Sequence, residues 1–209
     1  RAYLHRLGVT DAQGKVHKNS QDKFRQINKY VEVLDGLIKQ SDRGKKLRIV
    51  DMGAGKGYLT FALYDHLANS LRQDVGVVGV EQREDLVALC NDIARAEDFK
   101  NLRFVQGSIA KHDCAGADIV IALHACDTAT DDAIHKAIRA QAKLIVVAPC
   151  CHKQIRREME GGSGTHSLDV LLKHGTYVER MAEMVTDGLR AELLELQGYK
   201  TKLFEFISD

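Results

Sequence analysis

Several residue types are scarce or absent in this chain of 209 residues. It has no tryptophan, one proline and five cysteines, an odd number that lacks the spacing of a disulfide framework. Free cysteines are typical of a reducing compartment, so we expect a cytoplasmic protein. No apolar run approaches the roughly 18 residues of a membrane-spanning helix. No basic-then-apolar leader is present either, so the sequence favours neither membrane insertion nor secretion.

The net charge of +1 conceals an asymmetry along the chain. Residues 1–50 carry 12 Lys or Arg against 5 Asp or Glu, whereas the remaining residues carry 18 against 24. We therefore expect an N-terminal basic helical arm over residues 1–46 and a second, mildly acidic domain over residues 47–209. A basic arm is a weak indication of nucleic-acid binding, because charged helix faces are usually only solvated. The chain opens on Arg1 rather than methionine, so we expect it to be part of a longer protein.

Apolar runs and helical periodicity alternate along the sequence. Nearly continuous Val/Ile/Leu runs predict parallel strands buried on both faces, near 47–51, 75–80, 102–106, 118–123 and 143–148. Apolar residues at helical spacing predict helices near 20–40, 58–71, 84–96, 128–140 and 167–197. Residues 200–207 are expected to form a further strand. This order predicts an α/β fold, a Rossmann-like doubly wound and mostly parallel sheet with an N-terminal helical arm.

Residues 47–60 hold the most informative motif. An apolar run ends in Asp51, and Gly53, Gly55 and Gly57 follow at alternate positions before a helical pattern begins. A dinucleotide turn requires G-x-G-x-x-G, and a P-loop requires a hydroxyl residue after its lysine, where this chain has Gly57. An acid before G-x-G-x-G suits a cationic ligand instead. The alternative is a turn that only packs a strand against a helix.

A second acid follows the next predicted strand. Glu81 lies 24 residues beyond Gly57. A carboxylate about 20 residues past such a turn can accept hydrogen bonds from both ribose hydroxyls of an adenosine group. Gln82 could then line the adenine. The alternative is that Glu81 is a solvated charge at the end of a strand.

This pattern resembles motif I of the class I S-adenosylmethionine-dependent methyltransferases. The resemblance implies that Asp51 serves the amino-acid end of S-adenosyl-L-methionine, that the glycines make room for it, and that Glu81 holds its ribose. Many members have an acid near Ser108 for the adenine amine, whereas here Ser108 would donate a hydrogen bond and Ile109 would cover a ring face. The expected cofactor-binding residues are Asp51, Gly53, Ala54, Gly55, Gly57, Tyr58, Glu81, Gln82, Gly107, Ser108, Ile109 and Leu123. The fold usually closes with an antiparallel hairpin of two last strands, so the domain is expected to lack its last edge strand after residues 200–207.

Two loops after the fourth and fifth predicted strands carry a cysteine and histidine cluster. They read His-Ala-Cys-Asp over residues 124–127 and Pro-Cys-Cys-His-Lys over residues 149–153. Thiolates and imidazoles are zinc ligands, but adjacent cysteines chelate poorly, so no metal is expected. A cysteine nucleophile is a second interpretation, although methyl transfer from a sulfonium needs none. The third is a polar pocket that holds the acceptor beside a base.

The two loops narrow the resemblance. Leu-His-Ala-Cys-Asp-Thr-Ala-Thr-Asp with Ala-Pro-Cys-Cys-His-Lys resembles a methyltransferase subfamily that includes the eukaryotic tRNA 2′-O-methyltransferase acting near the acceptor stem. The subfamily also holds the methyltransferase-like domain of a glutathione-transferase-related protein and bacterial members. The likeness spans roughly residues 15–209, including the segment Glu183–Arg190, and Asp127 stands where several relatives have glycine.

The resemblance implies RNA as the acceptor, and the basic arm agrees with this. A small-molecule methyltransferase and a non-catalytic, S-adenosylmethionine-binding regulatory module are the alternatives. The oligomeric state stays open, and no membrane partner is expected. Candidate catalytic residues are Asp127, His124, His152, Cys150 and Cys151. Candidate substrate-binding residues are Lys23, Arg25 and Lys153.

Overall fold

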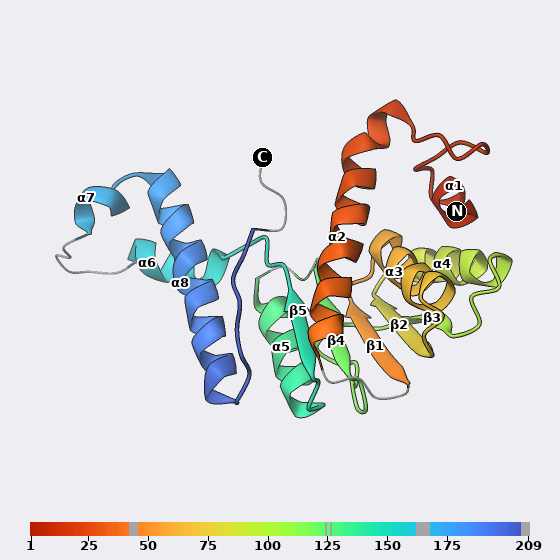
Figure 1. Cartoon of the computed structure of the whole chain (residues 1–209). Helices are drawn as coiled ribbons and strands as arrows, with labels where there is room; N and C mark the ends of the chain where they lie inside the picture. Colours follow the sequence, from red (N-terminus) through yellow and green to blue (C-terminus); the bar gives the residue numbers. More distant parts are fainter. Residues whose placement is uncertain (42–45, 124, 126, 162–167, 206–209) are drawn as a thin grey trace.

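A single parallel sheet forms the centre of the computed structural model, which describes residues 1–41, 46–123, 125, 127–161 and 168–205. Its strands lie in the order β3-β2-β1-β4-β5 (Figure 1). Their bounds are β1 Leu47–Met52, β2 Val75–Glu81, β3 Leu102–Gln106, β4 Ile119–Ala122 and β5 Leu144–Val147. All four pairings are parallel, so the predicted fold class is confirmed.

The strand order reverses at β1, which fixes where a ligand can enter. Asp51 near the end of β1 is paired with Gly79 of β2 on one side and Ile121 of β4 on the other. In doubly wound sheets the chain leaves neighbouring strands in opposite directions at this point and opens a crevice at the carboxyl ends. The glycine turn and the loop after β4 therefore meet at one edge.

Helices form the outer layers. They are α1 Ala2–Arg6, η1 Lys18–Ser20, α2 Gln21–Gln40, α3 Tyr58–Tyr64, η2 Asp65–Ser70, α4 Glu84–Ala96, α5 Thr128–Arg139, α6 Lys153–Gly161, α7 Asp169–Leu172 and α8 Gly175–Leu196. The helix predicted over 58–71 divides into α3 and a π-helical turn, η2. The region predicted near 167–197 divides into α7 and α8, which pack together.

Alternate residues of the strands enter two separate hydrophobic cores. On β1, Ile49 joins the core beneath α1 to α4, whereas Val50 joins the core beneath α5. On β4, Ile121 and Val120 divide in the same way. Because side chains alternate across a strand, the continuous apolar runs supply both faces at once.

The predicted arm packs on the sheet. Ile27, Tyr30, Leu34 and Ile38 are buried along one face of α2, in the same core as Tyr3 of α1. Their helical spacing forms the apolar stripe that makes this contact. Figure 1 shows α2 crossing in front of the sheet, with α1 to the right of its upper part and above α4. The basic side chains of α2 are exposed.

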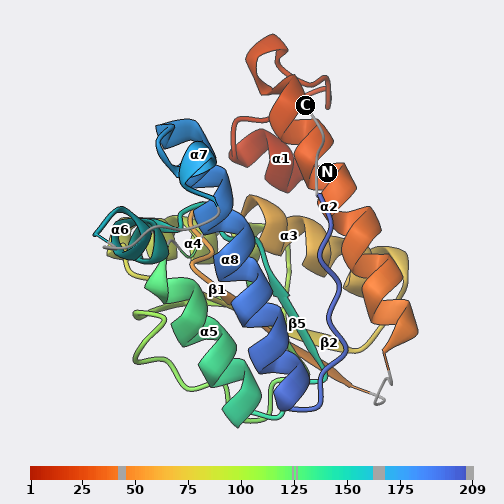
Figure 2. The same cartoon turned by 90° about the vertical axis from the view of Figure 1, so that its left-hand side faces the viewer.

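The prediction of a strand over residues 200–207 is wrong for residues 200–205. Residues 200–205 are not part of the sheet, and residues 206–207 lie outside the described range. Tyr199 donates a hydrogen bond to the Ala142 carbonyl oxygen at 2.8 Å, and the following residues run along α8 (Figures 1 and 2). A strand requires a hydrogen-bonded neighbour, and this segment has none among the described residues. Its Leu203 is 66% exposed.

Within the described residues, no helix combines the length and apolar character needed to cross a membrane.

Candidate active site

The three glycines after β1 all adopt left-handed backbone conformations. Their φ angles are 79° at Gly53, 57° at Gly55 and 71° at Gly57, a region that glycine enters without a steric penalty. The amides of Gly53 and Ala54 both donate to the Val80 carbonyl oxygen, at 2.9 and 3.0 Å. The turn is thereby fixed to the end of β2.

The glycines differ in what surrounds them. A Cβ atom at Gly57 would lie 2.9 Å from Cζ of Phe104, so this glycine permits close packing. Gly79 on β2 faces the same ring, where a Cβ atom would lie 2.5 Å from Phe104 Cδ1. A Cβ atom at Gly55 would meet nothing within 4 Å. The packing interpretation therefore applies to Gly57, whereas Gly55 adjoins open space that a ligand can enter.

Asp51 is a buried carboxyl group, 5% exposed. Its Oδ2 accepts a hydrogen bond of 2.6 Å from the Thr60 hydroxyl of α3. Burial raises the pKa of Asp51 from 3.8 to about 6, and the hydrogen bond from Thr60 offsets part of that rise. Tyr30 of α2 is fully buried nearby, and its pKa is raised by burial and by the charge of Asp51.

Glu81 links the glycine turn to the loop after β2. Its Oε2 accepts from the Gly55 amide at 2.9 Å, and its Oε1 accepts from the Arg83 amide at 3.0 Å. Each carboxylate oxygen has a second lone pair for a further donor. The carboxylate is therefore already oriented beside the open face of Gly55.

The remaining predicted adenine-side residues gather after β2 and β3. The Gly107 amide donates to the Glu81 carbonyl oxygen at 2.9 Å, and Gln106 Nε2 donates to the Gln82 carbonyl oxygen at 3.2 Å. Gln82 is exposed, Ser108 is half-buried, and half-buried Ile109 packs on the α5-side core. The side chain of Leu123 packs partly buried against the other core.

Tyr58 connects the glycine turn to the N-terminal basic arm. It is the first residue of α3, and its hydroxyl donates to the Leu7 carbonyl oxygen at 3.4 Å. The Lys23 ammonium lies 4.3 Å from the centroid of the Tyr58 ring, within cation–π range. The side chain of Tyr58 therefore faces the N-terminal segment, and only its backbone shares the helix terminus with the glycine turn.

Asp127 joins the loop after β4 to the helix that follows β5. It precedes α5 with φ 54° and ψ −125°. Its Oδ1 accepts from the Gln154 amide in the first turn of α6 at 3.3 Å. Arg190 of α8 donates to the Asp127 carbonyl oxygen at 3.1 Å. His124 and Cys126, predicted for the same loop, lie outside the described residues.

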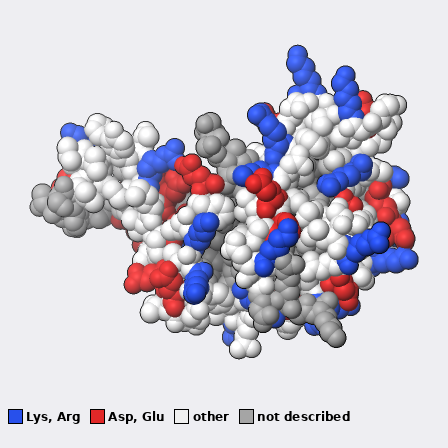
Figure 3. All heavy atoms as spheres, viewed as in Figure 1, with Lys and Arg blue, Asp and Glu red and all other residues white. Residues whose placement is uncertain are grey.

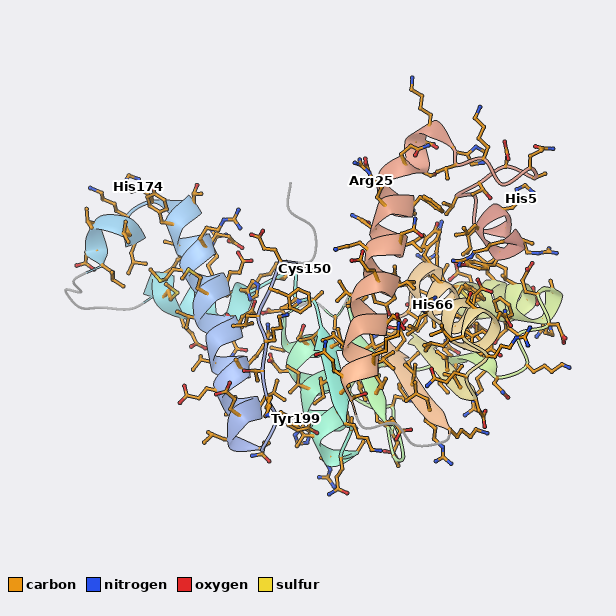
Figure 4. All side chains as sticks on the ribbon, viewed as in Figure 1. His5, Arg25, His66, Cys150, His174 and Tyr199 are labelled. Carbon is orange, nitrogen blue, oxygen red and sulfur yellow. The ribbon has the colours of Figure 1, made fainter. Side chains whose placement is uncertain are left out.

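The loop after β5 places a buried imidazole beside two thiols. His152 is 5% exposed, and its Nδ1 has no hydrogen-bond partner among the described residues. Cys150 is exposed and Cys151 half-exposed, with their sulfur atoms 3.7 Å apart. In Figure 4, Cys150 lies at the upper end of β5, between α8 and α2. Lys153, the first residue of α6, is exposed.

Metal-ligating side chains do not converge in the described part of the chain. No group of three or more His, Cys, Asp or Glu residues there is placed to hold a metal ion. The expectation that the site uses no metal stays a prediction, because two of the cluster residues lie outside that part.

Lys and Arg side chains gather on the N-terminal segment. Lys15, Lys18, Lys23, Arg25 and Lys29 are all exposed. Arg25 forms an ion pair with Asp22, and Lys29 forms one with Glu32 at 3.2 Å. Figure 3 shows basic side chains projecting from this end, whereas the surface below carries both signs. Arg25 projects from α2 in Figure 4.

Sequence reasoning missed three residues that complete the site. Thr60 donates its hydroxyl to Asp51, Tyr30 is buried near enough for the charge of Asp51 to act on it, and Arg190 holds Asp127. A signal existed for two of them. Tyr30 places a hydroxyl group on the apolar face of α2, and Arg190 continues the buried i, i+4 series of α8.

The residues present fit S-adenosylmethionine. Gly55 leaves the space that a side chain would fill, and Glu81 presents carboxylate oxygens beside it. Asp51 lies at the carboxyl end of the neighbouring strand.

Larger proteins contain a segment similar to this chain. The chain is 29% identical over 147 residues to the human glutathione S-transferase C-terminal domain-containing protein, covering 69% of this chain and 21% of that protein. The Xenopus laevis counterpart is 25% identical over 153 residues, covering 73% and 23%. The chain thus spans about a fifth of the length of the curated relatives it matches.

Some solved structures resemble parts of this chain at low identity. A putative S-adenosyl-L-methionine-dependent methyltransferase from Methanococcus maripaludis is 16% identical, with 63% of this chain and 61% of that chain covered and a TM-score of 0.46. A putative class I methyltransferase from Listeria monocytogenes is 18% identical, with 46% and 30% covered and a TM-score of 0.40. A family model described as a methyltransferase domain matches residues 22–158, and this chain therefore belongs to that family of methyltransferase domains.

Proposed function

We propose that this methyltransferase modifies RNA and that its acceptor atom is a hydroxyl oxygen, as in the tRNA 2′-O-methyltransferases that its two loops resemble. The observation that carries RNA is the contact between Lys23 of the N-terminal basic arm and Tyr58, the first residue of the helix after the glycine turn. Lys23 lies over the ring of Tyr58, the residue directly after Gly57. A nucleic-acid backbone lying on α2 would therefore pass beside the cofactor site.

The cofactor residues divide the binding of S-adenosylmethionine. Glu81 would hold the ribose, the open face of Gly55 would admit the chain between ribose and sulfur, and Asp51 would face the amino-acid end. When bound, the cofactor supplies a methyl group on a positively charged sulfur. The protein then has to place the acceptor oxygen in line with that methyl group and remove its proton.

His152 is the favoured base, and Asp127 is the alternative. The His152 imidazole is buried, and its Nδ1 has no partner among the described residues, so it is available to accept a proton. Asp127 already accepts the Gln154 amide, which suits it to hold the loop.

Radiolabelled methyl transfer into total RNA and into a metabolite extract, compared side by side, tests the acceptor. Label in RNA supports the proposal, whereas label in the extract alone identifies a small-molecule enzyme. Cofactor binding without label in either pool would indicate a regulatory module.

Substitutions at the two candidate bases test the mechanism. We expect His152→Gln to reduce methyl transfer at least about a hundredfold while S-adenosylhomocysteine affinity stays within about tenfold. Asp127→Ala should reduce transfer less. His135→Asn, which alters an exposed imidazole on α5, is the matched control and should keep full activity. Full activity of His152→Gln would exclude His152 as the base.

A further inference from the structure

Arg190 is a buried cation where α8 meets α5, and it is 7% exposed. Its Nε and Nη2 donate to the two carboxylate oxygens of Asp131 on α5, at 2.8 and 3.2 Å. Its Nη1 donates to Asp187 within α8 at 3.2 Å. Figure 2 shows the two helices side by side. The pair with Asp131 joins the two helices, and a fourth bond, from Nη2, reaches the Asp127 carbonyl oxygen at 3.1 Å.

The Asp127 backbone needs such a partner. A residue with a Cβ atom rarely adopts φ 54° with ψ −125°, so this backbone is strained. The strained peptide is held at several points. Its carbonyl oxygen also accepts from the Thr130 amide at 3.1 Å, and its carboxylate accepts from the Gln154 amide at 3.3 Å. A return to an ordinary φ would misalign these bonds together.

We propose that Arg190 is a positioning residue for the acceptor site. By holding the Asp127 carbonyl oxygen, it keeps the loop after β4 in its strained form and against the start of α6, where His152 lies directly before the helix. The contribution of this loop to methyl transfer rests on the proposed function, but the loop geometry that Arg190 maintains can be measured without turnover.

The competing explanation is that Arg190 only docks α8 on α5. Arg190→Lys separates the two roles. A lysine keeps the charge near Asp131, but its single ammonium cannot bond that carboxylate in a bidentate way and reach the Asp127 carbonyl as well. Asp187→Asn is the matched control, because it weakens one ion pair of the same guanidinium and leaves the bond to Asp127.

Amide hydrogen exchange and steady-state kinetics on the full chain decide the question. In Arg190→Lys we expect exchange at Thr130 and Gln154 to be at least about tenfold faster and kcat to fall about ten- to a hundredfold. The KM for S-adenosylmethionine and the affinity for S-adenosylhomocysteine should stay within about threefold, and Asp187→Asn should stay within about twofold throughout.

Unchanged exchange at both amides would overturn the proposal, as would a loss of cofactor affinity in proportion to kcat. If the wild-type protein methylates no acceptor, the proposed function fails while the exchange measurement still decides the role of Arg190. Asp127→Gly provides a second test, since glycine holds this conformation unaided. Adding Arg190→Lys to Asp127→Gly should then cause no further rise in exchange at Thr130, and a further tenfold rise would assign Arg190 to helix docking alone.

Discussion

Replacing Asp51 by asparagine should make the ligand-free protein more stable while weakening its binding of the cofactor. Burial raises the pKa of Asp51 from 3.8 to about 6, so the folded protein carries this charge at neutral pH against an unfavourable free energy. A shift of about two pKa units corresponds to about 3 kcal/mol. Asparagine keeps the shape and an acceptor for the Thr60 hydroxyl, but its amide also needs partners. We therefore expect the free energy of unfolding near pH 7.5 to rise by about 1–3 kcal/mol.

The pH dependence gives this prediction its sign. Because the folded pKa lies above the unfolded value, the folded state binds the extra proton between about pH 4 and pH 6. The contribution of Asp51 to stability is thus fully present below about pH 4 and is lost as the pH rises through about 6. The difference between Asp51→Asn and wild type should grow over this interval, since asparagine does not titrate.

Urea unfolding followed by circular dichroism at about pH 4.5 and about pH 7.5 measures the difference, and calorimetry with S-adenosylhomocysteine measures the functional loss. Asp92→Asn is the matched control. Its carboxylate is exposed beside Arg95, so its effect should stay within about 0.5 kcal/mol. A variant equally destabilised at both pH values, or one with undiminished cofactor affinity, would refute the reasoning.

Three further predictions concern the cofactor turn, the ribose carboxylate and the basic segment. Gly55→Val should abolish S-adenosylhomocysteine binding in calorimetry while the domain stays folded, and unchanged affinity in the folded variant would remove the cofactor assignment. Gly57→Ala should instead mainly lower the unfolding temperature. Glu81→Ala should weaken cofactor binding by about 1–3 kcal/mol, and an undiminished affinity would argue against its ribose role. Lys23→Glu with Arg25→Glu should weaken RNA binding and reduce the salt slope by about 0.7–0.9 per lost phosphate contact, without moving cofactor affinity. If the slope does not change, these charges are an ordinary solvated helix face.

The sequence predicted the sheet well, because buried parallel strands are continuous apolar runs. The five strand positions agree with the structure to within about two residues, the usual uncertainty of boundaries. The failure at residues 200–205 has a physical cause. An apolar segment indicates a tendency to be buried or extended. Strand formation also needs a neighbouring strand to pair with, and the local sequence does not show which strand lies close enough.

The sequence predicted the site residues whose positions follow from the spacing of a local motif. It did not predict the residues that reach the site through long-range contacts. Asp51, Gly55 and Glu81 follow from one strand–turn–helix unit and its successor. Arg190 lies 63 residues beyond Asp127, so no local pattern reveals their bond. The left-handed backbone of Asp127 is equally invisible from its own residue type.

The ring of Phe104 places a limit on how this family of sequences can change. It fills the space that a side chain at either Gly57 or Gly79 would occupy, so the turn that meets the cofactor and a strand of the sheet depend on one buried aromatic group. Residues 57, 79 and 104 should therefore covary among related sequences. A relative that carries alanine or a larger residue in place of Gly79 is expected to carry a smaller residue than phenylalanine in place of Phe104, and a chain with both bulky residues should place its glycine turn differently.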